Sequence, residues 1–209
     1  KVALMILDGW GHTERVDGNA FKQAKTPYFD SLFARYPHML LGTSGKCVGL
    51  PEGQMGNSEV GHTNMGAGRV VYQDFTRINK SIEDREFYDN PVLVQALEIC
   101  KERGSSFHMM GLLSDGGVHS HQEHVYALLE ACKRRGVKKV FVHALMDGRD
   151  TSPNDGVKYM AKLLDVMREK GVGQLGVVSG RYFMMDRDKR WDRVQLAYDA
   201  LVHGRGRTS

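Results

Sequence analysis

The spacing of hydrophobic positions changes near Tyr72. After this residue, short apolar runs alternate with stretches in which apolar residues recur every three or four positions. The runs are typical of buried strands, and the stretches are typical of amphipathic helices. Strands are predicted over residues 106–112, 139–146 and 174–179, and helices over residues 74–83, 92–103, 121–135, 153–170 and 191–202. This alternation indicates an α/β fold with a parallel, doubly wound sheet.

Glycine and proline sharpen the helix ends. Gly136 and Gly171 are expected to end the third and fourth of these helices, since glycine readily adopts the left-handed conformation that closes a helix. Thr151 or Ser152 is expected to cap the fourth helix, with Pro153 at its start. Polar clusters at residues 114–121, 147–152 and 180–187 follow the three strands. In such a sheet, ligands bind beyond the carboxyl ends of the strands.

The first 72 residues have a different pattern. The apolar run at residues 2–7 ends at Asp8 and predicts a buried strand that presents a carboxylate at its end. A helix is expected to begin at Pro27, and residues 39–42 are a candidate for a second strand. Residues 42–68 resemble a loop and contain eight of the 24 glycines.

Composition narrows the class of protein. The 209 residues carry 29 Lys and Arg against 25 Asp and Glu, and no apolar run approaches the ~18 residues of a membrane span. Residues 181–207 hold seven Lys and Arg against four Asp, a local excess that suits small anions better than nucleic acid. Three cysteines far apart indicate reduced thiols. We therefore expect a cytoplasmic protein without membrane or nucleic-acid partners.

Ser58 is a candidate nucleophile. It lies between Gly56 and Gly61, on a turn whose backbone would approach a ligand closely. A helix that begins just after Ser58 would favour a phosphate there through its free amides. A serine hydroxyl needs a base or a metal for activation, and His62 shows no triad order. The alternative is that Ser58 only caps a helix, and spacing alone leaves both open.

Several other polar residues have two interpretations. Asp8 is a candidate ligand for Mn²⁺ or Mg²⁺, or a turn cap. His119 is a candidate phosphate or acid–base residue, or a plain loop histidine; a zinc site with His121 and His124 is disfavoured by spacing. Arg149 next to Asp150, and the pair Arg181 and Arg187, suit bidentate anion binding, with solvated ion pairs as the alternative. An ionised Asp150 would accept a proton from a substrate hydroxyl.

Five segments together carry a resemblance to a known family. They are residues 6–11 (ILDGWG), 54–62 (QMGNSEVGH), 111–121 (GLLSDGGVHSH), 147–151 (DGRDT) and 180–188 (GRYFMMDRD). In this order they closely resemble the cofactor-independent (2,3-bisphosphoglycerate-independent) phosphoglycerate mutases, from the first residues to about Val202. The resemblance implies an α/β fold with two domains. Residues 1–72 would begin an alkaline-phosphatase-like metal-binding domain, and residues 73–209 would form most of a phosphotransferase-like substrate domain inserted into it.

The resemblance also implies roles. Ser58 would become phosphoserine, and Asp8 and Ser58 would share one of two Mn²⁺ ions, with Mg²⁺ or Co²⁺ as alternatives and no 2,3-bisphosphoglycerate. The substrate-binding positions would be His119, Arg149, Asp150, Arg181 and Arg187. Asp150 would exchange protons with glycerate hydroxyls. The implied reaction is the interconversion of 3-phosphoglycerate and 2-phosphoglycerate in glycolysis and gluconeogenesis, by a monomer.

The chain departs from the family in length. Family members are more than twice as long, and their remaining metal ligands lie in a C-terminal half, of which no Asp-His-Gly-Asn segment is found after Arg187. The chain alone is therefore expected to hold Asp8 and Ser58 without completing either metal site. Two alternatives are a related metal-dependent phosphatase or sulfatase, and a substrate-binding module around residues 73–209 without activity.

Overall fold

The computed structural model describes residues 1–207 and divides the chain into two compact units, residues 1–77 and a second unit that begins at Ile78. The sequence-based division lay at residues 72 and 73. Each unit is described by itself. No helix in the described part of the chain is long and apolar enough to cross a membrane.

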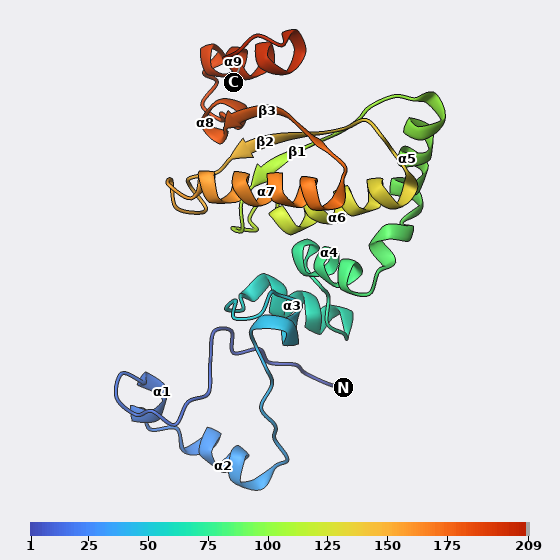
Figure 1. Cartoon of the computed structure of the whole chain (residues 1–209). Helices are drawn as coiled ribbons and strands as arrows, with labels where there is room; N and C mark the ends of the chain where they lie inside the picture. Colours follow the sequence, from blue (N-terminus) through green and yellow to red (C-terminus); the bar gives the residue numbers. More distant parts are fainter. Residues whose placement is uncertain (208–209) are drawn as a thin grey trace. The chain divides into compact units, whose positions relative to one another are not determined.

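The second unit is an α/β layer structure (Figure 1). Its sheet has the order β1-β2-β3, with β1 at Phe107–Leu113, β2 at Val140–Met146 and β3 at Gln174–Gly180, all parallel. Helices α6 (Gln122–Arg135) and α7 (Gly156–Lys170) connect the strands and cover one face of the sheet. The alternation of apolar runs and amphipathic stretches therefore predicted the parallel sheet correctly. The doubly wound arrangement was wrong for these connections, because α6 and α7 lie on the same face.

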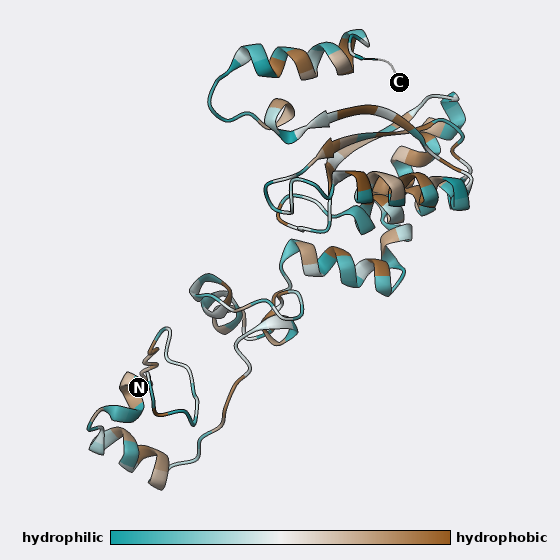
Figure 2. Cartoon of the chain, turned by 60° about the vertical axis from the view of Figure 1, so that its left-hand side comes forward, coloured by the Kyte–Doolittle hydropathy of each residue, from teal (hydrophilic) through white to brown (hydrophobic). Residues whose placement is uncertain are grey.

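The core of the second unit lies between the sheet and these two helices. The strands are its most hydrophobic segments (Figure 2). Leu129 of α6 and Leu163 of α7 are completely buried, and Val140 and Val142 of β2 face them from the sheet side of the core. Burial of a leucine side chain contributes about 2 kcal/mol, so this layer is the main source of stability in the unit.

Helices before and after the sheet complete the second unit. Helix α4 (Asp74–Glu83) spans the division between the units, and the 3₁₀ helix η2 (Glu86–Asp89) leads to α5 (Pro91–Arg103). After β3 come the one-turn helix α8 (Arg181–Met184), which the sequence pattern did not predict, and α9 (Trp191–His203).

Helix ends were predicted in part. Gly136 and Gly171 adopt positive φ angles of 73° and 66° and end α6 and α7, as expected. The predicted cap at Thr151 or Ser152 was wrong, because α7 begins at Gly156 and its N-cap residue is Asp155. The residues before it form turns that belong to the loop after β2.

The first unit contains short helices joined by long irregular segments. They are α1 (Ala20–Gln23), α2 (Pro27–Arg35), the 3₁₀ helix η1 (Gly45–Val48) and α3 (Ser58–Ala67). The helix expected at Pro27 is confirmed. A small buried cluster joins η1 to α3 through Val48, Leu50 and Val60.

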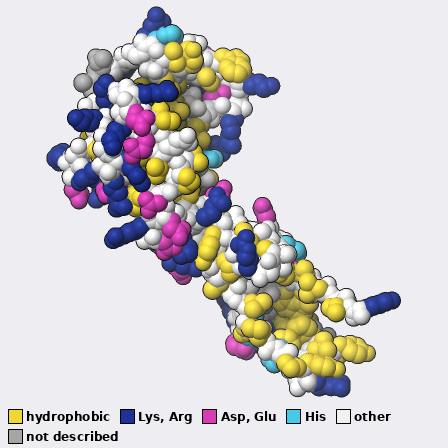
Figure 3. Space-filling view, turned by 90° about the vertical axis from the view of Figure 1, so that its right-hand side faces the viewer, with side chains coloured by type: hydrophobic (Ala, Val, Ile, Leu, Met, Phe, Trp, Pro, Cys, Tyr) yellow, Lys and Arg dark blue, Asp and Glu magenta, His cyan; other side chains and the backbone are white. Residues whose placement is uncertain are grey.

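The two strands predicted in the first unit were wrong. Residues 2–7 and 39–42 have no strand pairing, and Val2 and Leu4 are 100% and 77% exposed. A strand needs a neighbour for its amides and carbonyls, and all paired strands among residues 1–207 belong to the second unit. Figure 3 shows the resulting hydrophobic surface in the lower part of the view.

Candidate active site

Ser58 and Asp8 form a direct contact in the first unit. The Ser58 hydroxyl donates a hydrogen bond of 2.7 Å to Oδ2 of Asp8, although 50 residues separate them. Asp8 lies in the turn that follows the apolar run, and Ser58 is the first residue of α3. The structure therefore brings the predicted nucleophile and the predicted metal ligand together.

Asn57, and not Ser58, caps α3. The Asn57 side chain accepts a 3.0 Å hydrogen bond from the amide of Val60, in the usual N-cap geometry. The capping interpretation of Ser58 was therefore wrong, since the cap position is occupied by its neighbour. The Ser58 hydroxyl lies at the positive end of a ten-residue helix, where a phosphate is favoured.

Gly56 is required by the protein backbone. A Cβ atom at Gly56 would lie 1.8 Å from the carbonyl oxygen of Thr43, which no side chain tolerates. At Gly61, in contrast, a Cβ atom would meet nothing within 4 Å. The glycine before Ser58 thus brings two segments of the first unit together, which differs from the close approach to a ligand that the sequence suggested.

His62 does not serve as a base for Ser58 in this arrangement. Its Nδ1 atom lies 2.8 Å from the carbonyl oxygen of Ser58 and 3.1 Å from the Ser58 hydroxyl oxygen. Because a carbonyl oxygen only accepts, Nδ1 carries the proton and donates it. In this arrangement Asp8 is the acceptor for the Ser58 hydroxyl.

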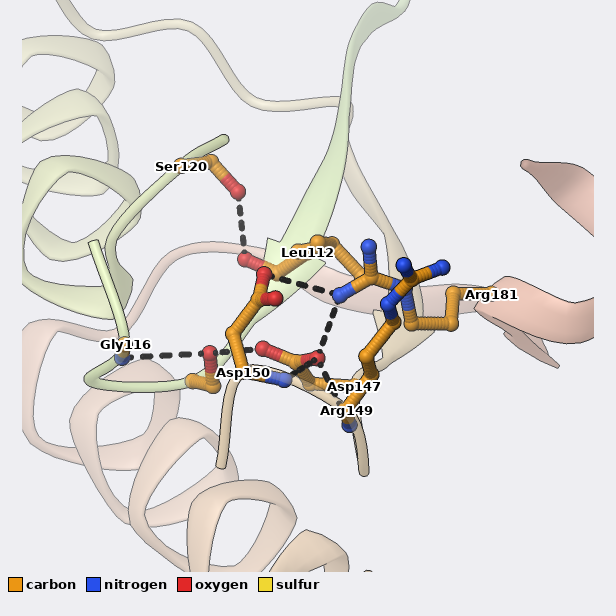
Figure 4. Close-up of polar contacts among 8 residues, drawn as sticks. Leu112, Gly116, Ser120, Asp147, Arg149, Asp150 and Arg181 are labelled. Atoms are coloured by element: carbon orange, nitrogen blue, oxygen red, sulfur yellow. Dashed lines mark hydrogen bonds and ion pairs between the residues drawn. The ribbon is translucent and has the colours of Figure 1, made fainter. Parts of the chain in front are cut away.

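The second cluster lies beyond the carboxyl ends of the strands (Figure 4). The Arg181 guanidinium contacts Asp147 Oδ1 at 2.7 Å and Asp150 Oδ2 at 2.8 Å. The Asp147 side chain is only 2% exposed, and those of Arg181 and Asp150 are 11% and 14% exposed. Such burial raises the strength of the pairing above that of surface ion pairs.

Asp147 organises this cluster. The Ser114 hydroxyl donates to its Oδ2 at 2.7 Å, and the amides of Arg149 and Asp150 donate to its Oδ1 at 3.2 and 3.1 Å. Burial by itself would raise the pKa of Asp147, but these hydrogen bonds and Arg181 together lower it to about 2. Asp147 is therefore ionised at every physiological pH.

Arg181 and Asp150 differ from the other predicted substrate residues. Arg181 is committed to two carboxylates, and its pKa is raised, first by the hydrogen bond to Asp150. His119, Arg149 and Arg187 are exposed, and within residues 1–207 their side chains form no hydrogen bond or ion pair. These three basic groups follow β1, β2 and α8. The alternative of an ion pair between Arg149 and Asp150 was wrong, because Asp150 pairs with Arg181.

Ser114, Asp147 and Asn57 were missed as site residues. Asp147 occurs in the segment Asp-Gly-Arg-Asp directly after a strand, where an aspartate commonly accepts amides two and three residues ahead. This signal was available for Asp147. Ser114 gave no comparable signal, because its contact with Asp147 crosses between two loops that are 33 residues apart.

Asp8 and Ser58 provide only part of a metal-binding site. Asp8 and Ser58 offer a carboxylate and a hydroxyl oxygen close together, which suits Mn²⁺ or Mg²⁺ by donor type. Across residues 1–207, no group of three or more His, Cys, Asp or Glu side chains is arranged to hold a metal ion.

Comparison with known proteins decides the family. The family described as "BPG-independent PGAM N-terminus" matches residues 78–209, more than half of the chain. The chain belongs to this family. The match begins at the first residue of the second unit.

Curated relatives agree with this assignment. The 2,3-bisphosphoglycerate-independent phosphoglycerate mutase of Clostridium perfringens strain ATCC 13124 is 55% identical over 205 residues, which are 98% of this chain and 40% of the relative. The enzyme of the same name from Colwellia psychrerythraea is 54% identical over an alignment of 212 positions, which covers 99% of this chain and 41% of the relative. The chain thus spans about 40% of the length of these relatives.

A solved structure has the same fold. The phosphoglycerate mutase of Leishmania mexicana, crystallised at low cobalt concentration, superposes with a TM-score of 0.65 at 34% sequence identity. The similarity covers 97% of this chain and 38% of the other. The resemblance expected from the five sequence segments is therefore confirmed.

Proposed function

We propose that this chain supplies the nucleophile and most of the substrate-binding groups of a phosphoglycerate mutase that interconverts 3-phosphoglycerate and 2-phosphoglycerate. The observation that carries the proposal is the Ser58 hydroxyl, which lies at the first position of α3 and donates to Asp8 at 2.7 Å. Family membership and the names of the relatives support the reaction.

In the proposed reaction, Ser58 Oγ attacks the phosphorus atom of the substrate while the bond between phosphorus and the glycerate oxygen breaks. The hydroxyl proton leaves toward Asp8, which already accepts it in a hydrogen bond. The leaving glycerate oxygen takes a proton from the protonated form of Asp150, and phosphoserine and glycerate result. The phosphoryl group then returns to the other glycerate hydroxyl by the reverse steps.

Asp150 is the proposed proton carrier for the glycerate hydroxyls. Its Oδ2 atom is bound by Arg181, whereas its Oδ1 atom has no hydrogen bond within the described residues. A substrate hydroxyl would bind there. Arg181 holds the Asp150 carboxylate in place. The exposed side chains of His119, Arg149 and Arg187 would bind the carboxylate and phosphate groups of the substrate.

Asp8 and Ser58 would hold one of two Mn²⁺ ions, with Mg²⁺ or Co²⁺ as alternatives. A divalent ion bound there would make the Ser58 hydroxyl a better nucleophile and offset phosphoryl charge. Further ligands must come from outside this chain, because two donors are too few for either ion. The reaction needs no 2,3-bisphosphoglycerate in this proposal.

We also propose the wider assignment that the sequence suggested. Residues 1–72 would begin an alkaline-phosphatase-like domain, into which a phosphotransferase-like domain is inserted from residue 73. The protein would act in the cytoplasm as a monomer. Arg181 and Asp150 favour a mutase over a phosphatase or sulfatase, since a hydrolase has no need to retain the dephosphorylated alcohol.

Calorimetric titration with 3-phosphoglycerate tests the binding half of this proposal. We expect weak binding to the chain without Mn²⁺, and at least a severalfold loss of affinity in Arg187→Ala. Arg168→Ala is the matched control, because Arg168 is an exposed α7 residue that pairs with Asp165 on the same helix. No binding with or without Mn²⁺, or an equal loss in both variants, would contradict the assignment of Arg187.

A further inference from the structure

Strands β2 and β3 change register halfway along their length. Phe141 and Val142 pair with Gln174 and Leu175, but Ala144 pairs with Val178. Two residues of β3, at positions 176 and 177, therefore lie opposite the single residue 143. This arrangement is a β-bulge, which inserts one extra residue into β3.

The amide of the bulge has a side-chain acceptor. The Val177 N–H donates to Nδ1 of His143 at 3.1 Å. The other ring nitrogen of His143 lies 2.9 Å from Nδ1 of His108 on β1. Because Nδ1 of His143 accepts, its Nε2 carries the proton and donates to His108. His143 thus uses both ring nitrogens in its neutral form, and satisfies an amide that the sheet ladder leaves unpaired.

The space beside His143 is fitted to this contact. A Cβ atom at Gly176 would lie 2.7 Å from Cε1 of the His143 ring, so only glycine lets the ring lie against the bulge. On the other side, the rings of His108 and His143 lie edge to edge and nearly parallel, with centroids 5.2 Å apart and an interplanar angle of 11°, as their hydrogen bond requires. The imidazole is therefore held between β1 and the bulge of β3.

The bulge decides which residue of β3 meets Asp147. With the extra residue, Met146 at the end of β2 pairs with Gly180 at the end of β3. The first residues after the two strands are therefore Asp147 and Arg181. Without it, Gly180 would stand beside Asp147, and Arg181 would be displaced by one residue. A slip of one residue also reverses the face to which a side chain points. The observed contacts of Arg181 with Asp147 and Asp150 need the shifted register (Figure 4).

We propose that His143 is a positioning residue for Arg181. By accepting the Val177 amide, His143 stabilises the bulge and thereby fixes the register that brings Arg181 to Asp147 and Asp150. The benefit for substrate binding rests on the proposed function, whereas the placement of Arg181 does not.

Nuclear magnetic resonance of the chain tests this assignment with His143→Phe, His143→Gln and the control His108→Ala. Phenylalanine fills the ring space without an acceptor, and glutamine offers an acceptor in a different shape. In His143→Phe we expect the Val177 amide to exchange with solvent about tenfold faster, and the Arg181 guanidinium protons to lose their slow exchange. In His143→Gln and His108→Ala, both signals should stay within about threefold of the wild-type chain.

The wild-type chain supplies an independent readout that needs no variant to fold. The nitrogen shifts of His143 should show the tautomer protonated at Nε2, and the Val177 amide should exchange as slowly as its neighbours in β3. A His143 protonated at Nδ1, or an unprotected Val177 amide, would overturn the proposal. So would a folded His143→Phe variant in which the Arg181 protons exchange as in the wild-type chain. None of these readouts depends on mutase activity, so they fail separately from the proposed function.

Discussion

At the scale of single residues, the neighbours Asn57 and Ser58 have different roles at the start of α3. Asn57 caps the helix, and Ser58 presents its hydroxyl to Asp8. In a complete mutase that contains this chain, Ser58→Ala should therefore abolish turnover of 3-phosphoglycerate and leave the thermal unfolding midpoint almost unchanged. Asn57→Ala is the matched variant, with stability lower by about 1 kcal/mol and the nucleophile retained. Substantial turnover in Ser58→Ala would remove Ser58 as the nucleophile.

Asp147 links the stability of the second unit to pH. Its pKa is lowered from 3.8 to about 2, so the folded state holds the ionised form more strongly than the unfolded state does. The resulting stabilisation, of about 2 kcal/mol, is complete above pH 4 and is lost as the pH falls toward 2. At pH 7, urea unfolding should therefore give a free energy of unfolding for Asp147→Asn that is lower than that of the wild-type chain by about 2 kcal/mol.

Asp165→Asn is the control for this prediction. Asp165 pairs with Arg168 on the surface of α7, where both side chains are more than half exposed, so its loss should change the free energy of unfolding by less than about 0.5 kcal/mol. Equal effects of Asp147→Asn and Asp165→Asn at pH 7 would show that Asp147 has no special role.

Some residues of the candidate site could be predicted from the sequence, and others could not. Ser58, Asp8 and Asp150 stood out because their types and neighbours fit a known chemistry. The role of Ser114 could not be predicted, since it depends on two loops that fold against each other. An ion pair between Asp150 and its neighbour Arg149 was one of two alternatives, but the register of β3 supplies Arg181 as the partner of Asp150 instead. Contacts between segments that are distant in the sequence depend on the fold, and the spacing of residues along the chain does not predict them.

At the scale of elements, the strands and helices after Tyr72 followed from hydrophobic period. The first unit did not, because an apolar run such as residues 2–7 becomes a strand only when another strand pairs with it. The start of α7 was also misplaced, since Thr151 and Ser152 lie in the loop between β2 and α7, which begins only at Gly156. Local pattern therefore predicts an element well where its partners are also in the chain.

Two adjacent leucines of α7 test the packing of this helix. Leu163 is fully buried against the sheet, whereas Leu164 is 41% exposed. Leu163→Ala should lower the free energy of unfolding by about 2–5 kcal/mol, and Leu164→Ala by less than about 1 kcal/mol. Urea unfolding monitored by circular dichroism gives both values. Similar losses would contradict the placement of α7.

His124 connects α6 to α4. Its Nε2 atom lies 2.7 Å from Oδ1 of Asn79, and burial, with a smaller effect of His121, lowers its pKa to about 4. Because the unfolded state takes up the proton first, this contact should lose stability as the pH falls from 6.5 toward 4. The proton shift of the His124 ring, followed by nuclear magnetic resonance, should have its midpoint near 4. A midpoint near 6.5 would show that the ring is solvated.

At the scale of the whole molecule, the chain covers about 40% of its curated relatives. Asp8 and Ser58 are two donors of a metal site that needs more, so we expect no turnover of 3-phosphoglycerate by the chain alone. Supplying the rest of a complete mutase should restore turnover. Coupled assays for 2-phosphoglycerate, with and without added Mn²⁺, measure both conditions. Mn²⁺-dependent turnover by the chain alone would show that its own residues complete the site.

The most direct test of the central claim is the covalent state of Ser58 during turnover. A complete mutase that contains this chain is mixed with 3-phosphoglycerate, quenched in acid and digested, and the peptide with Ser58 is analysed by mass spectrometry. We expect one phosphoryl group on Ser58, and both this group and the activity should be absent in Ser58→Ala. Turnover with no phosphoryl group on Ser58, or with the group on another residue, would contradict this claim.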